Sequence, residues 1–421
     1  MNERFHAIYF SAMLILLAFI QAAPADCETT MPINGTSCRG MSSFEKHFCA
    51  YLHRENIPAA SLTIAYKGKI IFSRAYGYSN LEQKVPLLPG DRFRIASLSK
   101  SITAVGILSL CENEKLKPDD KAFSILSDIK PCEPNYSIDP RIKDIRVRDL
   151  LQCSAGWEHE GIADPIFAKW LGTTAVKCTN NLRPSNIAII RNLLMQKLDY
   201  DPGTTYSYSN VSYCVLGQII EKITSQKYAD FINALILQPE NLQSFAIGST
   251  LNSSEHEVKY YPEESAVVNL LPNYKDQLGA ANGGFFMLEA APATIGWIAS
   301  TDDLVRFISI LSGETKIDPP INKKTFEQML ARPALDYWKT EPEYFAFGWE
   351  VERNKNGQLI AFSRHGSLPG TMALIEHQSN GISWAAAFNK RPLRYVERRE
   401  EVKALIKKSV KELLPQLSKG K

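Results

Sequence analysis

A serine and a lysine three residues apart form the first pair in this sequence whose types and spacing could do chemistry. The stretch FRIASLSKSITAVGILSL, residues 93–110, places Ser97 and Lys100 on one face of a predicted helix, which Ala104 and Ile107 continue with apolar side chains. Burial on such a face disfavours the ammonium form of a lysine and lowers its pKa. The neutral amine can then take the proton of a neighbouring hydroxyl, which turns serine into a nucleophile.

The Ser-x-x-Lys pattern is weak on its own, because the chain contains it four times, beginning at Ser43, Ser97, Ser127 and Ser418. Most helical lysines simply extend to water. Ser43 and Ser127 lie in polar, charged segments, and Ser418 lies in the C-terminal tail. Only Ser97 opens a long apolar run, so Ser97 is the candidate nucleophile.

A serine activated by a lysine also needs a second proton carrier and donors for the developing oxyanion. The best candidate for the carrier lies in YSYSNVSYCVLGQIIEKI, where Tyr208 and Asn210 occupy a short loop before an apolar helix. A second Tyr-Ser-Asn begins at Tyr78, but it follows a predicted strand and is more simply a turn. The turn Asp201-Pro202-Gly203 would present the loop that carries Tyr208.

The composition indicates an ordinary globular protein that is long enough for two or three domains or one large core. Of 421 residues, 45% are hydrophobic and 22% charged, and the net charge of +3 is too small to favour nucleic acid or an anionic membrane as partner. The seven histidines are scattered, and no His-Glu-x-x-His, Gly-x-Ser-x-Gly or phosphate-binding glycine loop occurs. We therefore predict a small-molecule or peptide substrate and neither a metal nor another cofactor, and leave the oligomeric state open.

Residues 1–25 predict a secretory signal peptide, and hence a secreted, extracellular protein. Arg4 precedes the apolar run AIYFSAMLILLAFI, which is followed by the small-x-small pattern Ala23-Pro24-Ala25. The run has about 14 residues where a membrane span needs about 20, so no stable span is expected after cleavage. The eight cysteines all follow this site, and an even number in an exported chain favours disulfides of undetermined connectivity.

Four sequons for N-glycosylation follow, at Asn34, Asn135, Asn210 and Asn252. Three of them suit the surface of a secreted glycoprotein. Asn210 differs, because it lies in the candidate site loop and should face a cleft rather than carry a glycan.

Strand patterns lie near both ends of the chain, with helical patterns between them. AASLTIAYKGKIIFSRAYGY predicts two strands joined at Lys67-Gly68, and four more strand patterns, YFAFGWEVERN, QLIAFSRHG, TMALIEHQ and ISWAAAFNK, come late. We predict an α/β (α+β) fold with one antiparallel sheet built from N- and C-terminal segments, flanked by helices, and a large inserted helical domain. The predicted domain spans residues 41–415, with 41–96 and 340–415 forming the sheet and its helices and 97–339 the mainly helical insertion. The site should lie where the two parts meet.

Five motifs in order, FRIASLSKS, LLQCSAGW, DPGTTYSYSNVSYCVLG, IASTDDLVRF and SRHGSLPG, make the chain similar to the serine β-lactamase and penicillin-binding protein family. The resemblance covers roughly residues 45–410 and is closest to the class C and esterase-like branch. It implies a β-lactamase/transpeptidase-like fold, with Ser97 as acylated nucleophile, Lys100 as its proton partner and Tyr208 as the second acid/base group. It also implies that Asn210 binds the amide-like side of the substrate, and that the backbone N–H groups of Ser97 and Ser367 receive the oxyanion.

The sequence departs from the family pattern at two positions. Cys153 in LLQCSAGW stands where the family usually has a histidine, and we infer nothing catalytic from it. The third motif of the family has Lys or His, a small residue and then Gly, and counting back from Pro369-Gly370 gives Arg364-His365-Gly366. Arg364 then takes the cationic position.

A slip of one residue would instead make His365 the functional side chain and would reverse the face of every strand residue. We favour Arg364 because that register needs no deletion in the turn. An arginine stays charged and can bind a carboxylate through two hydrogen bonds. The candidate substrate-binding residues are therefore Asn210, Arg364, His365, Gly366 and Ser367.

Two functions from different classes fit this sequence. The leading one is a secreted serine hydrolase that passes an acyl group from a peptide, ester or β-lactam-like substrate through Ser97 to water. The alternative is a catalytically silent binding or scaffold protein with the same fold. The altered third motif supports the alternative, and the intact set Ser97, Lys100, Tyr208 and Asn210 argues against it.

Overall fold

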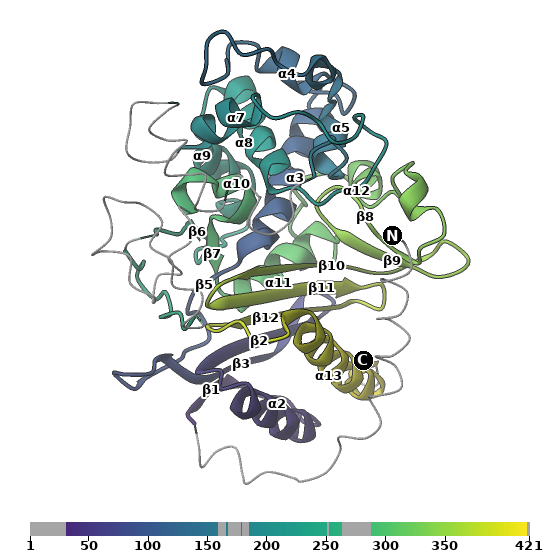
Figure 1. Ribbon diagram of the computed structural model, residues 1–421. Coiled ribbons are helices and arrows are strands. Elements are labelled where there is room, and N and C mark those ends of the chain that lie inside the picture. The colour runs from purple at the N-terminus through teal and green to yellow at the C-terminus, as the bar shows by residue number, and fades with distance from the viewer. Residues whose placement is uncertain are drawn as a thin grey trace.

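The computed structural model describes residues 31–158, 166, 178, 185–250, 252–262 and 288–418. A nine-stranded antiparallel sheet runs through the middle of the molecule, and strands from both ends of the described chain lie side by side in it (Figure 1). The strand order is β1-β3-β2-β12-β11-β10-β9-β8, with β4 paired to β3. The strands are β1 Ile33–Thr36, β2 Ala59–Tyr66, β3 Lys69–Asn80, β4 Val85–Pro86, β8 Glu343–Phe345, β9 Glu350–Arg353, β10 Leu359–Leu368, β11 Thr371–Gln378 and β12 Ile382–Phe388.

Tight turns with left-handed residues connect the main hairpins, and one of them lies at Lys67-Gly68, where the sequence predicted it. Lys67 and Gly68 have φ of 50° and 73° between β2 and β3. Gly370 and Gly381 have φ of 85° and 87° in the turns on either side of β11. Glycine adopts this conformation without steric cost, which fixes where each strand reverses.

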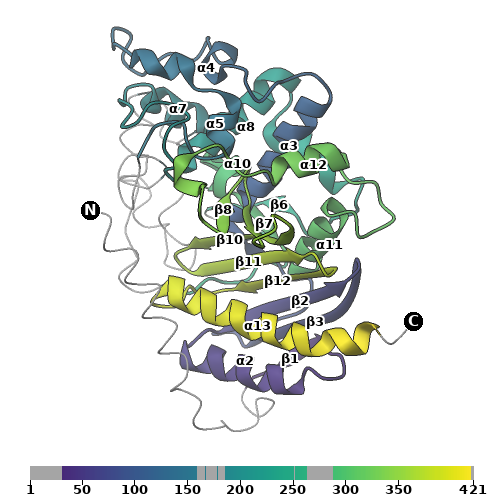
Figure 2. The ribbon, with the colours of Figure 1, turned by 90° about the vertical axis from the view of Figure 1, so that its right-hand side faces the viewer.

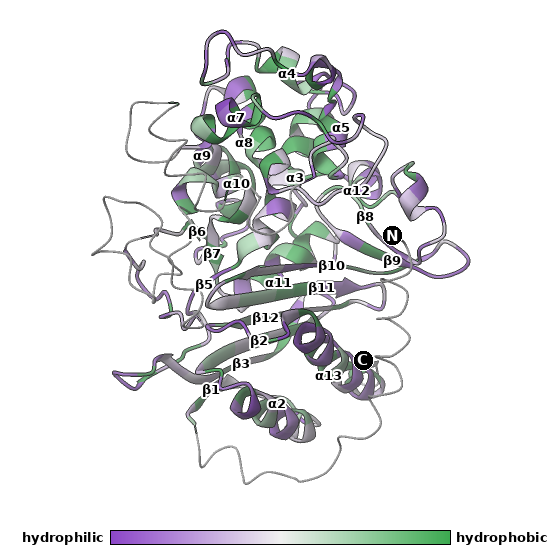
Figure 3. Ribbon diagram, in the orientation of Figure 1, coloured by the Kyte–Doolittle hydropathy of each residue, from purple (hydrophilic) through white to green (hydrophobic). Residues whose placement is uncertain are grey.

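Helices cover both faces of the sheet (Figures 1 and 2). On one face lie α2, Ser42–Arg54, and α13, Tyr395–Ser418, whose apolar residues pack with the sheet in one core cluster. Both helices mix hydrophilic and hydrophobic residues (Figure 3), as expected when one side of a helix faces water. On the other face, α11, Thr301–Leu311, contacts β2, β11 and β12. The α/β architecture with an antiparallel sheet and flanking helices is thus confirmed.

The remaining helices pack above that second face, around α3, in which every residue from Ser99 to Leu110 is buried. A small sheet with the order β5-β7-β6 joins this region; its strands of two or three residues are too short to show alternation in a sequence. The α-helices are α3 Ser99–Glu112, α4 Ala122–Ile125, α5 Val147–Leu151, α7 Asn186–Leu193, α8 Asn210–Thr224, α9 Tyr228–Ile232, α10 Pro292–Ile295 and α12 Lys323–Met329. The short strands are β5 Phe93–Arg94, β6 Ala246–Ile247 and β7 Trp297–Ala299. Single turns of other helix types are η2 Ala96–Leu98, η3 Pro140–Asp144, η5 Asn233–Leu237, η9 Leu288–Ala290 and η10 Asp336–Trp338.

The division into a sheet part and an inserted part at residues 97 and 339 stays a prediction. One helix of the predicted insertion, α11, packs directly on the sheet, because its apolar residues are needed to cover that face. The insertion therefore contributes to the sheet layer as well as to the helical layer.

The cysteines are partly paired. Cys132 and Cys178 form a disulfide, and Cys49 is also disulfide-bonded. Cys38, Cys111, Cys153 and Cys214 are not disulfide-bonded. Disulfides were predicted, although the sequence could not give their pairing. The predicted signal peptide lies outside the described residues, and within those residues no helix is both long and apolar enough to cross a membrane.

Candidate active site

Ser97 lies in the single turn η2, which leads directly into the buried helix α3. The residue before it, Ala96, is fully buried and has a φ of 48°, in the left-handed region that costs a non-glycine residue on the order of 1–2 kcal/mol. Strain of this kind persists where surrounding structure enforces it, and it is common beside functional groups. Ser97 itself is half-buried and lies just before the N-terminal end of the buried helix α3.

Lys100 is fully buried one turn later and points back to Ser97. Its Nζ lies 3.1 Å from Ser97 Oγ, 2.6 Å from Asn210 Oδ1 and 3.3 Å from the carbonyl oxygen of Thr294. Burial lowers the pKa of Lys100; Tyr208 opposes this effect, and Arg364 reinforces it. Because all three of these hydrogen-bonding partners are uncharged, none of them offsets the cost of burying the ammonium form. The first turn of α3 therefore favours a neutral amine next to the serine hydroxyl.

Two other Ser-x-x-Lys copies lie in different surroundings. Ser43 and Lys46 are exposed on α2, and Ser127 and Lys130 are exposed in a surface turn. Exposure leaves these lysines hydrated, so they lack the feature that makes Lys100 a candidate base.

Tyr208 approaches Ser97 from a loop of the helical region. Its hydroxyl donates to Ser97 Oγ at 2.9 Å. The backbone N–H of Ser207 donates to the carbonyl oxygen of Cys153 at 2.9 Å, so the LLQCSAGW segment supports this loop. Burial raises the pKa of the Cys153 thiol, which keeps it protonated and unreactive.

Asn210 is the first residue of α8, with Ser209 as the residue that caps the helix. Its side-chain oxygen accepts from Lys100, and its backbone oxygen accepts from Thr294 Oγ1 at 3.0 Å. Thr294 belongs to α10, a segment that sequence reasoning missed. No motif marks it, because it contributes a backbone carbonyl to the lysine and because it lies 194 residues away in the chain.

Arg364 reaches the same serine from the sheet. It is 2% exposed on β10, and its Nε donates to the carbonyl oxygen of Ser97 at 3.2 Å. Its Nη1 lies 3.3 Å from Glu350 Oε1, and its Nη2 donates to the hydroxyl of Tyr208 at 2.7 Å. The guanidinium also stacks 4.9 Å from the centre of the Phe345 ring. All three nitrogens already have protein acceptors, so this arginine is less free to bind a substrate carboxylate than the sequence suggested.

His365 points to the other side of β10, as alternation along a strand requires. Its Nδ1 lies 2.8 Å from Glu350 Oε1, and its Nε2 lies 2.7 Å from Arg399 Nη1 on α13. The structure therefore brings Arg364, and not His365, to Ser97. Glu350, which contacts both, was missed because a single acidic residue in a strand pattern usually marks a solvated face.

Gly366 lets β10 approach the nucleophile closely. A Cβ atom at this position would lie 2.0 Å from the carbonyl oxygen of Ile95 and 2.8 Å from the backbone nitrogen of Ser97, closer than real side chains allow. The next residue, Ser367, has a buried Oγ without a hydrogen-bond partner within the described residues. Only glycine thus fits between the strand and the backbone N–H of Ser97.

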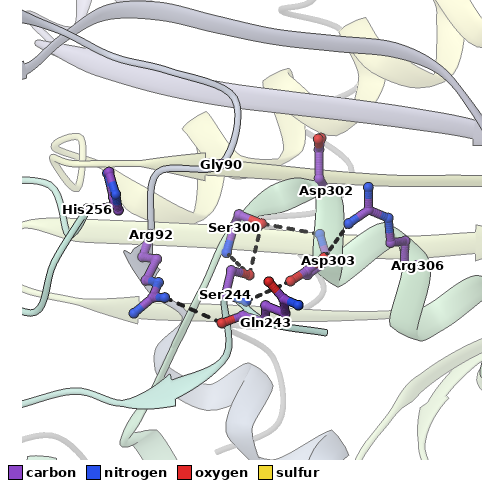
Figure 4. A pocket seen from close by; sticks show the side chains of 9 residues that line it. All are labelled: Gly90, Arg92, Gln243, Ser244, His256, Ser300, Asp302, Asp303 and Arg306. Carbon is purple, nitrogen blue, oxygen red and sulfur yellow. Dashed lines mark hydrogen bonds and ion pairs between the residues drawn. The ribbon is translucent and has the colours of Figure 1, made fainter. Parts of the chain in front are cut away.

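A separate pocket of about 240 Å³ lies at the N-terminal end of α11 (Figure 4). Its lining combines basic and acidic side chains, but the carboxylates are already hydrogen-bonded: Asp302 accepts from Thr63 and Ser73, and Asp303 accepts from Ser244 N and Arg306. In the described parts of the chain, no cluster of His, Cys, Asp and Glu could hold a metal ion.

Residues 44–406 match the family model described as beta-lactamase. The chain belongs to the beta-lactamase family. This membership places it among hydrolases in general and accounts for the order of its motifs. The match spans both the sheet and the helical region, so it includes every candidate site residue named above.

The relatives agree with this membership. The chain is similar to Protein flp of Staphylococcus aureus (strain N315), with 27% identity over 72% of this chain and 55% of that protein, so it matches about half the length of this relative. Its fold is similar to the octameric penicillin-binding protein homologue from Pyrococcus abyssi, with a TM-score of 0.65 and 20% identity over 87% of this chain and 77% of the other. It is also similar to the D-amino acid amidase from Ochrobactrum anthropi SV3, with a TM-score of 0.65 and 19% identity over 87% of this chain and 100% of the other.

Proposed function

We propose that the protein is a secreted serine hydrolase that forms an acyl-enzyme on Ser97 and passes the acyl group to water. The observation that carries the proposal is the pair of contacts at Ser97 Oγ, 3.1 Å from Lys100 Nζ and 2.9 Å from the Tyr208 hydroxyl. A nucleophile needs a base within hydrogen-bond reach and a second group to handle the leaving-group proton. Lys100 and Tyr208 are both within hydrogen-bonding distance of Ser97 Oγ.

The proposed reaction has two steps. In the first, neutral Lys100 accepts the proton of Ser97 as Oγ attacks the substrate carbonyl, and the backbone N–H groups of Ser97 and Ser367 receive the oxyanion. Tyr208 gives its proton to the leaving nitrogen or oxygen, and the proton taken up by Lys100 restores the tyrosine. In the second step water attacks the ester of Ser97, the same groups move protons in reverse, and the carboxylic acid leaves.

The substrate class follows from this chemistry as an acyl compound: a peptide, an ester or a β-lactam-like ring. The names of the relatives above, an amidase and a penicillin-binding protein homologue, support acyl transfer without choosing among these substrates. Secretion is supported by the signal-like N-terminus, the sequons and the disulfide between Cys132 and Cys178. Glycosylation and the choice of substrate belong to the same proposal.

Acylating probes test this proposal directly. The purified secreted protein is treated with a fluorophosphonate and, separately, with a penicillin, and the adduct is located by intact mass and peptide mapping. We expect one adduct on Ser97, which Ser97→Ala abolishes. Ser127→Ala, in an exposed copy of the same pattern, is the matched control and should label like the wild type.

Two results would refute the proposal. An adduct on Ser43 or Ser127 would show that the wrong copy was chosen. No adduct on folded protein with either probe would favour the alternative, a catalytically silent binding or scaffold protein.

A further inference from the structure

Glu350 joins the two neighbouring residues of the altered third motif. One of its oxygens, Oε1, lies 3.3 Å from Arg364 Nη1 and 2.8 Å from His365 Nδ1. Arg364 faces Ser97 and Tyr208, whereas His365 faces α13. A single carboxylate thus holds an arginine on the active-site side of β10 and a histidine on the opposite side.

Contacts between the start of β9 and α3, the helix that carries Lys100, fix the position of Glu350. Two residues earlier, Gly348 has a φ of 79° and lies against α3, where a Cβ would be 2.9 Å from Ala104 Cβ and 3.1 Å from the Lys100 carbonyl oxygen. Ser101 Oγ donates to the carbonyl oxygen of Gly348 at 2.8 Å. The start of β9 is therefore held against the same turn that places Lys100.

The hydrogen bonds around His365 require a neutral ring. Arg399 Nη1 can only donate, so His365 Nε2 accepts and the ring proton sits on Nδ1, where it is donated to Glu350. The charged and titratable groups that face the ring are Glu350 from β9, Arg399 and Tyr395 from α13, and Arg364 from its own strand. Burial lowers the pKa of His365 and, together with the two arginines, outweighs the opposite effect of Glu350, which agrees with the neutral form.

Glu350 is in turn held as a carboxylate. Burial works against its charge, but His365 and the cations Arg364 and Arg399 together hold its pKa well below the usual range. A buried guanidinium needs such a partner, because an unpaired charge away from water is costly. Without Glu350, the orientation of Arg364 would rest on Ser97, Tyr208 and the ring contacts alone.

We propose that Glu350 and His365 are positioning residues, which hold the Arg364 guanidinium so that its Nη2 orients the Tyr208 hydroxyl toward Ser97. The chain of contacts runs from α13 through His365, Glu350 and Arg364 to Tyr208. The proposal rests on the proposed acyl-enzyme function. In this chain, Arg364 with its partners Glu350 and His365 would take the place of the single Lys or His of the family's third motif.

The test measures kcat and KM for hydrolysis of p-nitrophenyl butyrate by full-length wild-type protein and single variants. Glu350→Ala should lower kcat by about tenfold to a hundredfold, the effect of losing a hydrogen bond to a charged group, and should leave KM within about twofold. Glu350→Gln keeps an acceptor oxygen and the shape of the side chain, so it should recover part of the loss. His365→Ala should cost only about threefold, because it removes a bond to Glu350 and not the carboxylate itself.

Glu352→Ala is the matched control. Glu352 lies on the same strand, is 31% exposed where Glu350 is 29% exposed, and lies 3.7 Å from Lys407 of α13, but it has no contact with Arg364. Its kcat and KM should equal those of the wild type. If it lowers kcat as much as Glu350→Ala does, the effect is general destabilisation and the positioning role is refuted.

The remaining outcomes separate this inference from the proposed function. Wild-type kcat in Glu350→Ala, with normal acylation of Ser97, overturns the positioning role and leaves the hydrolase intact. A larger loss in His365→Ala than in Glu350→Ala overturns it too, since His365 would then act directly. No acylation of Ser97 in the wild type refutes the hydrolase, and the positioning role falls with it. Should Glu350→Ala fail to fold, Glu350→Gln still decides, because unchanged kcat and raised KM in that variant contradict the proposal.

Discussion

Two buried basic side chains, Lys100 and Arg364, flank Ser97, and their surroundings shift their pKa values in opposite directions. Lys100 on α3 is 0% exposed and Arg364 on β10 is 2% exposed, so burial alone does not distinguish them. The acceptors of Lys100 are neutral, and burial lowers its pKa. Burial also works against the charge of Arg364, but Tyr208 and Glu350 outweigh it and raise its pKa.

The difference depends on both the basic group and its partner. A buried amine without a carboxylate can lose its proton and become a base, whereas a guanidinium stays charged, and its carboxylate partner offsets the cost of burying that charge. The helical side of the site thus supplies the group that moves a proton, and the sheet side supplies the charge that stays in place.

Substitution of Lys100, on the helical side of the site, should have the largest effect on the acylation of Ser97. Lys100→Arg keeps a positive charge but cannot supply a neutral amine, so the acylation rate constant of Ser97 should fall by at least about 100-fold. Stopped-flow measurement with a chromogenic ester gives this rate constant. Lys130→Arg, at an exposed copy of the pattern, should react like the wild type, and a full rate in Lys100→Arg would make Lys100 structural.

Substitution of Arg364, on the sheet side of the site, should have a smaller effect on hydrolysis, and this effect should not depend on the charge of the substrate. Arg364→Ala should slow hydrolysis of an acidic ester and of its methyl-capped analogue equally, by about tenfold to a hundredfold and at least as much as Glu350→Ala, because the guanidinium is already engaged with Ser97, Tyr208 and Glu350. Paired kcat/KM measurements on the two esters compare these losses. If the acidic ester loses about 2 kcal/mol more, Arg364 binds the substrate carboxylate, as the sequence first suggested.

The sequence predicted the helical side of the site better than the sheet side, for a physical reason. Ser97 in η2 and Lys100 in α3 are one turn apart, and Tyr208 lies just before α8, which begins at Asn210. Local spacing and motif order therefore predict each pair. The contacts of Arg364 depend on strand register and on Glu350 in another strand, and no local pattern shows them.

The same limit applies to the fold. The long strands and terminal helices follow from periodicity and turn residues. The small sheet of β5, β6 and β7 and the packing of α11 on the main sheet depend on contacts between distant segments, so they were missed. Thr294 escaped notice for the same reason, since its backbone oxygen is what reaches Lys100.

The smallest effect should come from the sequons away from the site. Asn135 and Asn252 are exposed, whereas Asn210 is 8% exposed and bonded to Lys100. Glycopeptide mapping of secreted protein should find glycan on Asn135 or Asn252 and none on Asn210. Asn135→Gln should then leave the acylation rate unchanged, and glycan on Asn210 would show that the helical side of the site faces solvent.

The pH dependence of Ser97 acylation shows whether Lys100 acts as a neutral base. Because burial lowers the pKa of Lys100 below its ordinary 10.5 and the neutral amine is the reactive form, the rate constant should rise with pH through that lowered pKa and then level off. As pH falls through the same value, the amine gains its proton and the rate falls. Single-turnover measurements from pH 5 to pH 11 should show this limb in the wild type and lose it in Lys100→Arg. A midpoint at or above 10.5, or the same limb in both proteins, would contradict the assignment of Lys100 as the neutral base.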